Sequence, residues 1–91
     1  MYKIVSSKQF KRDLKISLKR GYDLNKLKEV VNTLASGDAL PKKHKDHNLS
    51  GKYSKFRECH IEPDWLLVYR ADKECLELFL FRNGTHSDLF R

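Results

Sequence analysis

Several features are scarce in this 91-residue chain, and each scarcity excludes a class of protein. Two cysteines, outside any C-x-x-C pair, are too few for the disulfide framework of a small secreted domain. Apolar runs such as residues 65–69 are far shorter than the roughly 20 residues that span a bilayer. Residues 1–5 turn polar at once, so we expect no export signal, no membrane, and a cytoplasmic protein with reduced thiols.

What the chain does have is an asymmetric charge. Its length allows a single domain over residues 1–91, and 40% hydrophobic residues supply one modest core. The formal net charge is +7. Residues 1–46 hold 12 Lys and Arg against 5 Asp and Glu, whereas residues 47–91 hold 7 of each. One basic half favours a polyanionic partner, either nucleic acid or an acidic protein segment.

The N-terminal half predicts a strand over residues 2–5 and then a helix. Ser6 and Ser7 offer an N-cap, and the helix continues to about residue 20, where Gly21 is well placed to end it. At roughly 100° per residue two faces separate, one apolar (Phe10, Leu14 and Leu18) and one basic (Lys8, Lys11, Arg12, Lys15 and Lys19).

A second helix is predicted from a cap at Asp23 or Asn25 to about Ser36, with Gly37 as its stop. Its leucines and valines lie within roughly 120° of one another around the helix axis and form one apolar stripe. Two amphipathic helices joined by a few residues predict a helical hairpin that covers another layer.

The C-terminal half is typical of strands. We expect a loop at 38–52, strands at 53–61, 65–70 and 75–81, and turns at 62–64 and 71–74. Short connections make these strands an antiparallel meander with the helix pair on one face. The expected fold class is α+β, in the order β-α-α-β-β-β. Cys59 and Cys75 both fall in expected strands, which favours ordinary packing.

Four histidines are the side chains that exchange protons near pH 7. His47, His60 and His86 flank expected strand ends and could converge on one cleft, whereas His44 lies in a lysine-rich loop. A structural zinc site is disfavoured because only His44 and His47 are close and no cysteine pair accompanies them. A cysteine nucleophile is disfavoured because Cys59 and His60 are neighbours in a strand and point to opposite faces.

The remaining set of basic residues, histidines and the carboxylate Asp64 is what a metal-free ribonuclease uses. RNA carries its own nucleophile, the 2′-OH, so the enzyme supplies a base, an acid for the leaving 5′-oxygen, and cations for the phosphate. Arg82 is the natural cation, because a guanidinium binds phosphate oxygens bidentately; a surface role at a strand end is its alternative. Trp65 and Phe90 could stack on bases, with core packing or C-terminal anchoring as alternatives.

Four segments, in order, resemble the YafQ family of toxins, within the RelE/ParE superfamily of type II toxin–antitoxin systems. They are DHNLSG (46–51), RECHI (57–61), PDWLLVY (63–69) and GTHSDLF (84–90). The N-terminal half matches in pattern only. The resemblance implies a RelE-like fold and an mRNA interferase that cuts mRNA in the ribosomal A site. It also implies silencing by a cognate antitoxin in a hetero-oligomer, and we expect no metal or other cofactor.

Carried onto this sequence, the family's functional positions are His47, His60, Asp64, Trp65, Arg82, His86 and Phe90. The resemblance supports a shared acid–base role for the histidines and Asp64. We assign His86 as the general acid and either Asp64 or His47 as the base. Arg82 is expected to stabilise the phosphate and His60 to position it.

The basic half then has an expected use. The basic face of the first helix, with Lys42, Lys43 and Lys45, would grip ribosomal RNA, and an antitoxin segment would cover the same surface. Two alternatives stay open. A ParE-like toxin inhibits DNA gyrase by binding and needs no histidine cluster, and a non-catalytic RNA-binding module needs only the basic residues.

Overall fold

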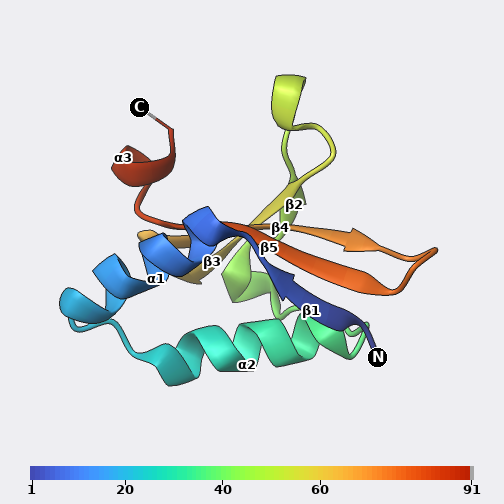
Figure 1. Cartoon of the computed structure of the whole chain (residues 1–91), viewed down its shortest axis with the longest axis horizontal. Coiled ribbons are helices and arrows are strands. Elements are labelled where there is room, and N and C mark those ends of the chain that lie inside the picture. The colour runs from blue at the N-terminus through green and yellow to red at the C-terminus, as the bar shows by residue number, and fades with distance from the viewer. Residues whose placement is uncertain (91) are drawn as a thin grey trace.

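A computed structural model describes residues 1–90, in which a five-stranded sheet carries two helices on one face (Figure 1). The elements are β1 (Lys3–Ser6), α1 (Lys8–Lys19), α2 (Leu24–Ala35), the 3-10 turn η1 (Lys42–His44), β2 (His47–Asn48), the 3-10 turn η2 (Gly51–Tyr53), β3 (Arg57–Glu62), β4 (Trp65–Asp72), β5 (Glu77–Gly84) and α3 (His86–Leu89). The strand order is β1-β5-β4-β3-β2. The α+β class and the helix-pair-then-meander order are therefore confirmed.

The predicted antiparallel meander is observed, and the N-terminal strand, whose pairing was not predicted, makes the sheet mixed. Strands β2 to β5 pair antiparallel, whereas β1 runs parallel to β5. The connection from β1 through α1 and α2 crosses the sheet and allows this pairing. Within residues 1–90, no helix is long and apolar enough to cross a membrane.

The core lies between the helices and one face of the sheet. It joins Phe10 of α1, Leu27, Val30, Val31 and Ala35 of α2, and Cys59, Ile61, Trp65, Leu67, Tyr69, Leu78 and Leu80 of β3 to β5. Strand β4 is also buried on its other face, through Leu66 and Val68. Burial on both faces explains why residues 65–69 form a continuous apolar run in the sequence.

The predicted helix ends are confirmed. The Ser7 hydroxyl accepts a hydrogen bond from the Phe10 N–H at 2.9 Å, and the Asp23 carboxylate accepts one from Asn25. Gly21 (φ 83°) and Gly37 (φ 80°) follow the two helices in the left-handed conformation that favours glycine.

The predicted apolar face of the first helix is partly wrong. The buried side chains of α1 are Phe10, Asp13 and Ser17, whereas Leu18 is 44% exposed. The helix is turned toward β5 because Asp13 and Ser17 hydrogen-bond to it, Ser17 through its hydroxyl to Asn83 at 2.9 Å. Polar contacts distant in sequence thus decide which face is buried.

Several strand boundaries also differ from the predictions. The strand expected at 53–61 begins at Arg57, the one expected at 75–81 covers Glu77–Gly84, and the loop at 38–52 contains β2. Cys75 lies exposed in the β4–β5 turn, where its N–H donates to Asp72, so its expected packing in a strand is wrong. Cys59 is buried in the core as predicted, and burial raises the pKa of its thiol, which opposes a nucleophilic role.

Candidate active site

Two segments rise from the sheet face opposite α2, with β4 and β5 between them (Figure 1). One runs from β2 through η2, and the other is α3. A cavity of about 110 Å³ lies between them and is lined by Leu49, Tyr53, Val68, Phe81, Arg82, Leu89 and Phe90. The predicted cation Arg82 and the predicted stacking residue Phe90 therefore share one cavity.

Three predicted histidines and Asp64 form one continuous line of contacts. Glu58 Oε1 lies 3.5 Å from His47 Nε2 and 4.0 Å from His60 Nε2. The ring centroids of His60 and His86 are 6.1 Å apart. At the far end, Asp64 Oδ1 lies 3.6 Å from His86 Nδ1 and accepts the His86 backbone N–H at 3.2 Å. The predicted convergence of these residues is observed.

Strand pairing places the first three members of this line. His47 of β2 is the cross-strand partner of Glu58 on β3, so their side chains lie on one face. Glu58 and His60 are two residues apart on the same strand and project to the same side. The β3–β4 turn then carries Asp64, and His86 is the first residue of α3. Four separate elements therefore contribute to one site.

Glu58 is a site residue that sequence reasoning missed. Its side chain is only 6% exposed, and a buried carboxylate is costly unless it has charged or hydrogen-bonding partners. Within residues 1–90 its ion-pair partners are His47 and His60. The signal in the sequence was the Glu-x-His spacing within an expected strand.

Backbone carbonyls fix the protonation pattern of two histidine rings. His47 Nδ1 lies 2.7 Å from the Lys45 carbonyl oxygen, and His60 Nδ1 lies 3.1 Å from that of Pro63. A carbonyl only accepts hydrogen bonds, so Nδ1 carries the proton in both rings. The Nε2 atom of each ring faces the Glu58 carboxylate.

The loop that carries His47 is tied to the sheet by a second polar cluster. Asp46 Oδ1 accepts hydrogen bonds from Tyr69 Oη at 2.6 Å and from Arg57 Nε at 3.2 Å. Arg57 Nη1 also donates to Asn48 Oδ1 at 2.6 Å. These contacts hold the two residues that flank His47, so the loop position is determined by β3 and β4.

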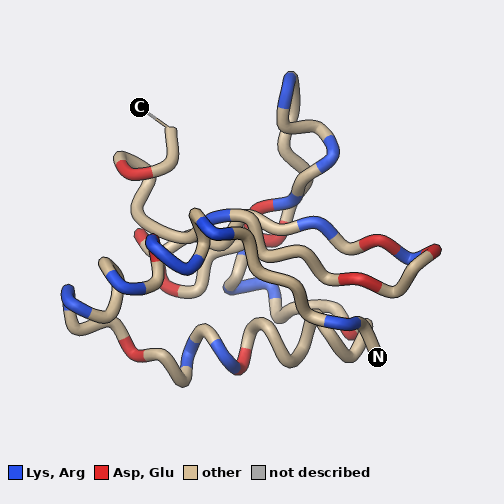
Figure 2. Tube along the Cα trace, in the orientation of Figure 1, with Lys and Arg blue, Asp and Glu red and all other residues tan. Residues whose placement is uncertain are grey.

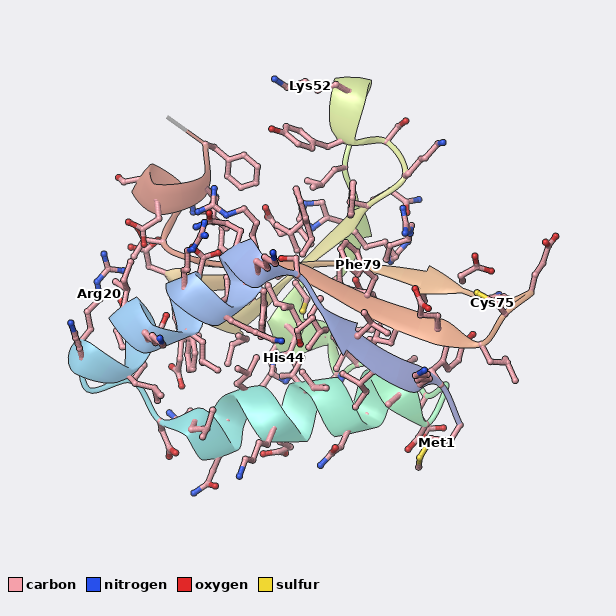
Figure 3. All side chains as sticks on the ribbon, viewed as in Figure 1. Met1, Arg20, His44, Lys52, Cys75 and Phe79 are labelled. Carbon is pink, nitrogen blue, oxygen red and sulfur yellow. The ribbon has the colours of Figure 1, made fainter. Side chains whose placement is uncertain are left out.

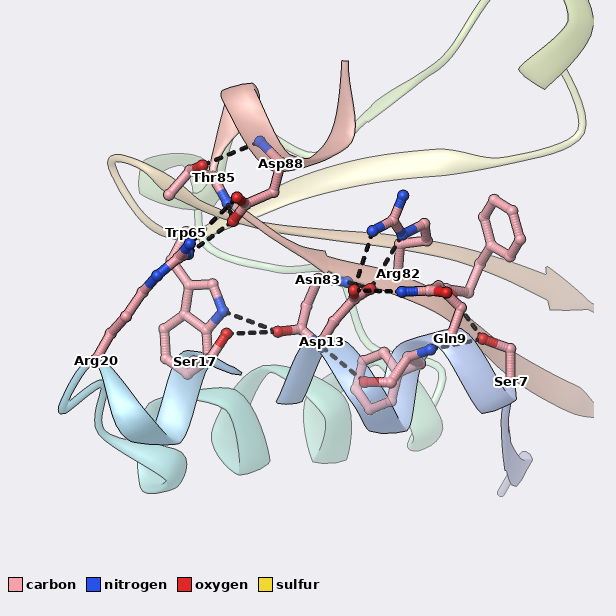
Figure 4. Close-up of polar contacts among 12 residues, drawn as sticks. Ser7, Gln9, Asp13, Ser17, Arg20, Trp65, Arg82, Asn83, Thr85 and Asp88 are labelled. Carbon is pink, nitrogen blue, oxygen red and sulfur yellow. Dashed lines mark hydrogen bonds and ion pairs between the residues drawn. The ribbon is translucent and has the colours of Figure 1, made fainter. Parts of the chain in front are cut away.

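Arg82 is held by a carboxylate from α1 (Figure 4). Its Nε and Nη2 donate to the two oxygens of Asp13, each at 3.0 Å. Asp13 is 5% exposed and also accepts the Asn83 N–H and the Gln9 side-chain amide. The hydrogen bonds with Asp13 raise the pKa of Arg82 above its ordinary value. Asp13 was not predicted, because nothing local in a basic helix marks one aspartate as buried.

Helix α3 has only four residues and needs support to form. A capping box supplies it: Thr85 Oγ1 accepts the Asp88 N–H, and Asp88 Oδ2 accepts the Thr85 N–H at 2.9 Å. Arg20 donates two further hydrogen bonds to Asp88, at 2.7 and 3.2 Å, and they lower the pKa of that carboxyl well below its ordinary value. A Cβ atom on Gly84 (φ 154°) would lie 2.8 Å from Asp88 Oδ2, so glycine is required there.

The two predicted stacking residues differ. Trp65 is 1% exposed, packs against Tyr22 with centroids 5.0 Å apart, and donates its indole N–H to Asn83 (Figure 4). The prediction that Trp65 stacks on bases is therefore corrected, since its ring is part of the core. Phe90 is 42% exposed, and its ring centroid lies 6.1 Å from that of His86, so its ring is accessible beside the histidines.

The basic residues predicted to bind RNA come from α1 and from around η1, and Figure 2 shows further Lys and Arg on α2 and on the segment that carries η2. The predicted side chains of α1 are all exposed, as are Lys42, Lys43 and Lys45 around η1. Lys43 and Lys45 line a cavity of about 470 Å³ that is also lined by His60. His44, expected to be a surface residue, is half-buried, and its Nδ1 lies 2.7 Å from the His60 carbonyl oxygen.

Metal ligands do not gather in the described part of the chain. Among residues 1–90, no three His, Cys, Asp or Glu side chains form a group that could hold a metal ion. The observed arrangement is instead a line of side chains with His47 at one end and His86 with Asp64 at the other. A fixed guanidinium lies in the adjoining cavity.

Comparisons with known proteins show what the whole chain is similar to. Residues 2–91 match the family model of the bacterial toxin of type II toxin–antitoxin systems, YafQ. The mRNA interferase toxin YafQ of Escherichia coli K12 is 40% identical over 85 residues, which cover 92% of this chain and 90% of that protein. A metal-bound toxin from Helicobacter pylori has a TM-score of 0.93 at 51% identity, covering 99% and 100% of the two chains. The E. coli DinJ-YafQ toxin–antitoxin complex gives a TM-score of 0.89 at 38% identity, covering 99% and 98%.

Proposed function

The chain belongs to the YafQ family of bacterial type II toxins, with a RelE-like fold, and from this premise we propose that it is a ribosome-dependent mRNA endoribonuclease. A cognate antitoxin binds it and blocks cleavage, as the toxin–antitoxin complex of the E. coli relative supports. The observation that carries the proposal is the line from His47 through Glu58 and His60 to His86 and Asp64, beside Arg82.

The proposed reaction uses the 2′-OH of the substrate as the nucleophile. A base removes its proton, the oxygen attacks the adjacent phosphorus, and the bond to the 5′-oxygen breaks while an acid protonates that oxygen. The products are a 2′,3′-cyclic phosphate and a 5′-OH. Every step is a proton transfer or a displacement at phosphorus, so the protein must supply one base, one acid and positive charge.

The contacts favour one assignment of base and acid. Asp64 is engaged with His86 through both the ring and the backbone N–H, so it orients His86 as the general acid. His47 is then the base: its Nδ1 proton is held by the Lys45 carbonyl, and Glu58 beside Nε2 stabilises the imidazolium that forms when Nε2 takes the 2′-OH proton. His60 lies between the two ends and positions the phosphate.

Arg82 stabilises the charge that builds on the phosphate oxygens. Asp13 occupies one N–H on Nε and one on Nη2. A guanidinium has five N–H donors, so three are left for a ligand in the cavity that it lines. Fixed donors that need no reorganisation are the main source of such stabilisation.

The basic groups on α1 and around η1 account for ribosome dependence in this proposal. They lie on α1 and around η1 and can neutralise rRNA phosphates, which makes binding salt-dependent. mRNA on the ribosome is then the substrate, and the cytoplasm is the place of action. No metal is needed, because histidines and Asp64 transfer the protons.

The test is cleavage of a defined mRNA on purified ribosomes by the unaltered protein, by His86→Ala and by the control Lys73→Ala, an exposed turn residue. We expect the unaltered protein and Lys73→Ala to cleave the mRNA in the presence of EDTA. The cleavage rate of His86→Ala should be lower by about 10²-fold or more. Thermal melting checks that this variant is folded. Growth arrest with intact mRNA and altered DNA supercoiling would instead indicate a gyrase inhibitor, and mRNA binding without cleavage would indicate an RNA-binding module.

A further inference from the structure

Three arginines project from the central strands, and one of them differs from the others. Arg57 is paired with Asp46 and Arg82 with Asp13. Among residues 1–90, Arg70 on β4 has no carboxylate within 4.0 Å of its guanidinium. Its charge acts only at longer range: the hydrogen bond from the Cys75 N–H lowers the pKa of Asp72, and Arg70 helps to lower it further.

Arg70 is nevertheless held in place by aromatic rings. Its guanidinium carbon lies 5.3 Å from the ring centroid of Phe79, its cross-strand partner, and 5.6 Å from that of Phe56. Phe81 stacks on Phe56 at 4.6 Å and lies 6.2 Å from Phe79. We call Phe56, Phe79 and Phe81 the aromatic platform; Figure 3 labels Phe79 on β5. Cation–π contact fixes the guanidinium but leaves its N–H groups free to donate.

A β-bulge joins this platform to the candidate active site. The register of β4 with β5 passes from Val68–Arg82 to Tyr69–Leu80, so Phe81 is the extra residue. In regular β-structure Phe81 and Arg82 would point to opposite faces, whereas the bulge lets both line the same cavity. The Ser7 hydroxyl donates to the Phe81 carbonyl oxygen at 2.6 Å and holds the bulge.

The spacing along β4 places Arg70 next to the position beside Arg82 where the scissile phosphate is proposed to bind. Arg70 lies two residues from Val68, the partner of Arg82, and so on the same face at roughly 6.6–6.8 Å along the strand. This step is comparable with the separation of successive phosphates in single-stranded RNA. A fixed, unpaired guanidinium at that distance suits a second phosphate better than an apolar peptide side chain.

We propose that Arg70, supported by the aromatic platform, binds the mRNA phosphate next to the one that is cleaved. This subsite rests on the proposed ribonuclease function and extends the cavity of Arg82 along β4 and β5. Its ligand is a phosphodiester of single-stranded RNA, recognised by charge and by the planar N–H donors of arginine. An acidic antitoxin segment is the competing occupant.

The experiment measures single-turnover cleavage of ribosome-bound mRNA in which either phosphate flanking the scissile one is replaced by a neutral methylphosphonate. For the unaltered protein, one of the two replacements should slow cleavage about tenfold or more, since it removes the charge-assisted hydrogen bonds to Arg70. Arg70→Gln should show similar slowing on normal mRNA and no further slowing on the neutral substrate. The cleavage rate of Arg70→Lys should lie between those of the unaltered protein and Arg70→Gln. Lys73→Gln should cleave at the rate of the unaltered protein.

Other outcomes overturn the inference. Cleavage by the unaltered protein that is insensitive to both neutral linkages excludes the subsite, whether or not any variant folds. Slowing of Arg70→Gln that is equal on both substrates shows that Arg70 does not act on that phosphate. Weakened antitoxin binding with unchanged cleavage shows that the platform is an antitoxin surface. Failure of the unaltered protein to cleave any mRNA contradicts the proposed function itself, and the subsite with it.

Discussion

The two carboxylate oxygens of Asp13 each accept a hydrogen bond of 3.0 Å from the guanidinium of Arg82. The pair joins α1 to β5 across 69 positions of the sequence. It also links the basic N-terminal half to the half that carries His47, His60 and His86. The helix that displays the lysines is therefore the element that fixes Arg82, the arginine that we propose binds the phosphate.

Removal of this carboxylate should affect both stability and cleavage. Asp13→Asn leaves the partly exposed Arg82 without its counter-charge and should lower the free energy of unfolding by about 2–3 kcal/mol, measured by urea denaturation. Cleavage should also fall. In an Arg82→Ala background the effect of Asp13→Asn on cleavage should disappear, because Asp13 acts through Arg82. Asp38→Asn, an exposed loop variant, is the control.

The outcome that contradicts this role of Asp13 is an additive loss of cleavage in the double variant. Additivity means that the two residues act independently. Asp13 would then be a structural residue of α1 only.

Replacement of Asp88 should change how stability depends on pH. The folded-state pKa of Asp88 is depressed, so its stabilisation is fully present above its ordinary pKa near 4 and is lost as pH falls through the folded value. Asp88→Asn should therefore melt lower than the unaltered protein at pH 7, and the difference should shrink in acid. Melting temperatures from pH 7 to pH 2 provide the measurement. A difference that is constant with pH would exclude the Arg20–Asp88 pair as its source.

Gly84 should tolerate no side chain. In Gly84→Ala the new methyl group meets the Asp88 carboxylate at 2.8 Å in a conformation that is strained for alanine, at a cost of about 1–3 kcal/mol. Helix α3 should shift, and cleavage should fall with it. Gly21→Ala is a matched control, since Gly21 also has positive φ but open space around its Cβ position. Equal losses of cleavage in the two variants would show that steric contact with Asp88 is unimportant.

Glu58→Gln tests the buried carboxylate between two histidines. The amide keeps the size and part of the hydrogen bonding, so melting should change little, whereas loss of the charge between His47 and His60 should slow single-turnover cleavage by about 10-fold or more. Glu74→Gln, exposed in the β4–β5 turn, should cleave normally. Unchanged cleavage by a folded Glu58→Gln protein would remove Glu58 from the site.

Local chemistry explains what the sequence predicts well. Ser7, Asp23 and Gly21 act on backbone groups within a few residues, so their capping roles can be recognised without a fold. The histidines and Asp64 could be recognised because their side-chain types have few other uses in combination. The short turns predict the antiparallel order of β3, β4 and β5, which brings Asp64 and His86 together, whereas the β2–β3 pairing that places His47 was not predicted.

The features that could not be predicted depend on partners distant in sequence. Asp13 looks like one more charge on a surface helix until Arg82 and Asn83 of β5 are placed beside it. The bulge at Phe81 leaves no mark in the sequence, because it depends on the register of β4 with β5. Trp65 gives no sign that its ring points to the core, where its N–H meets Asn83.

The most direct measurement is the chemistry of the cleaved ends. Ribosome-bound mRNA is incubated in EDTA with the unaltered protein or with His86→Ala, and the ends of any fragments are identified. A second mRNA, with a 2′-deoxyribose at the cleavage position, is treated in the same way. We expect a 2′,3′-cyclic phosphate and a 5′-OH, no cut in the deoxy substrate, and a loss of about 10²- to 10⁴-fold with folded His86→Ala. Cleavage of the deoxy substrate, a 5′-phosphate product, or full activity of His86→Ala would contradict the histidine-based mechanism.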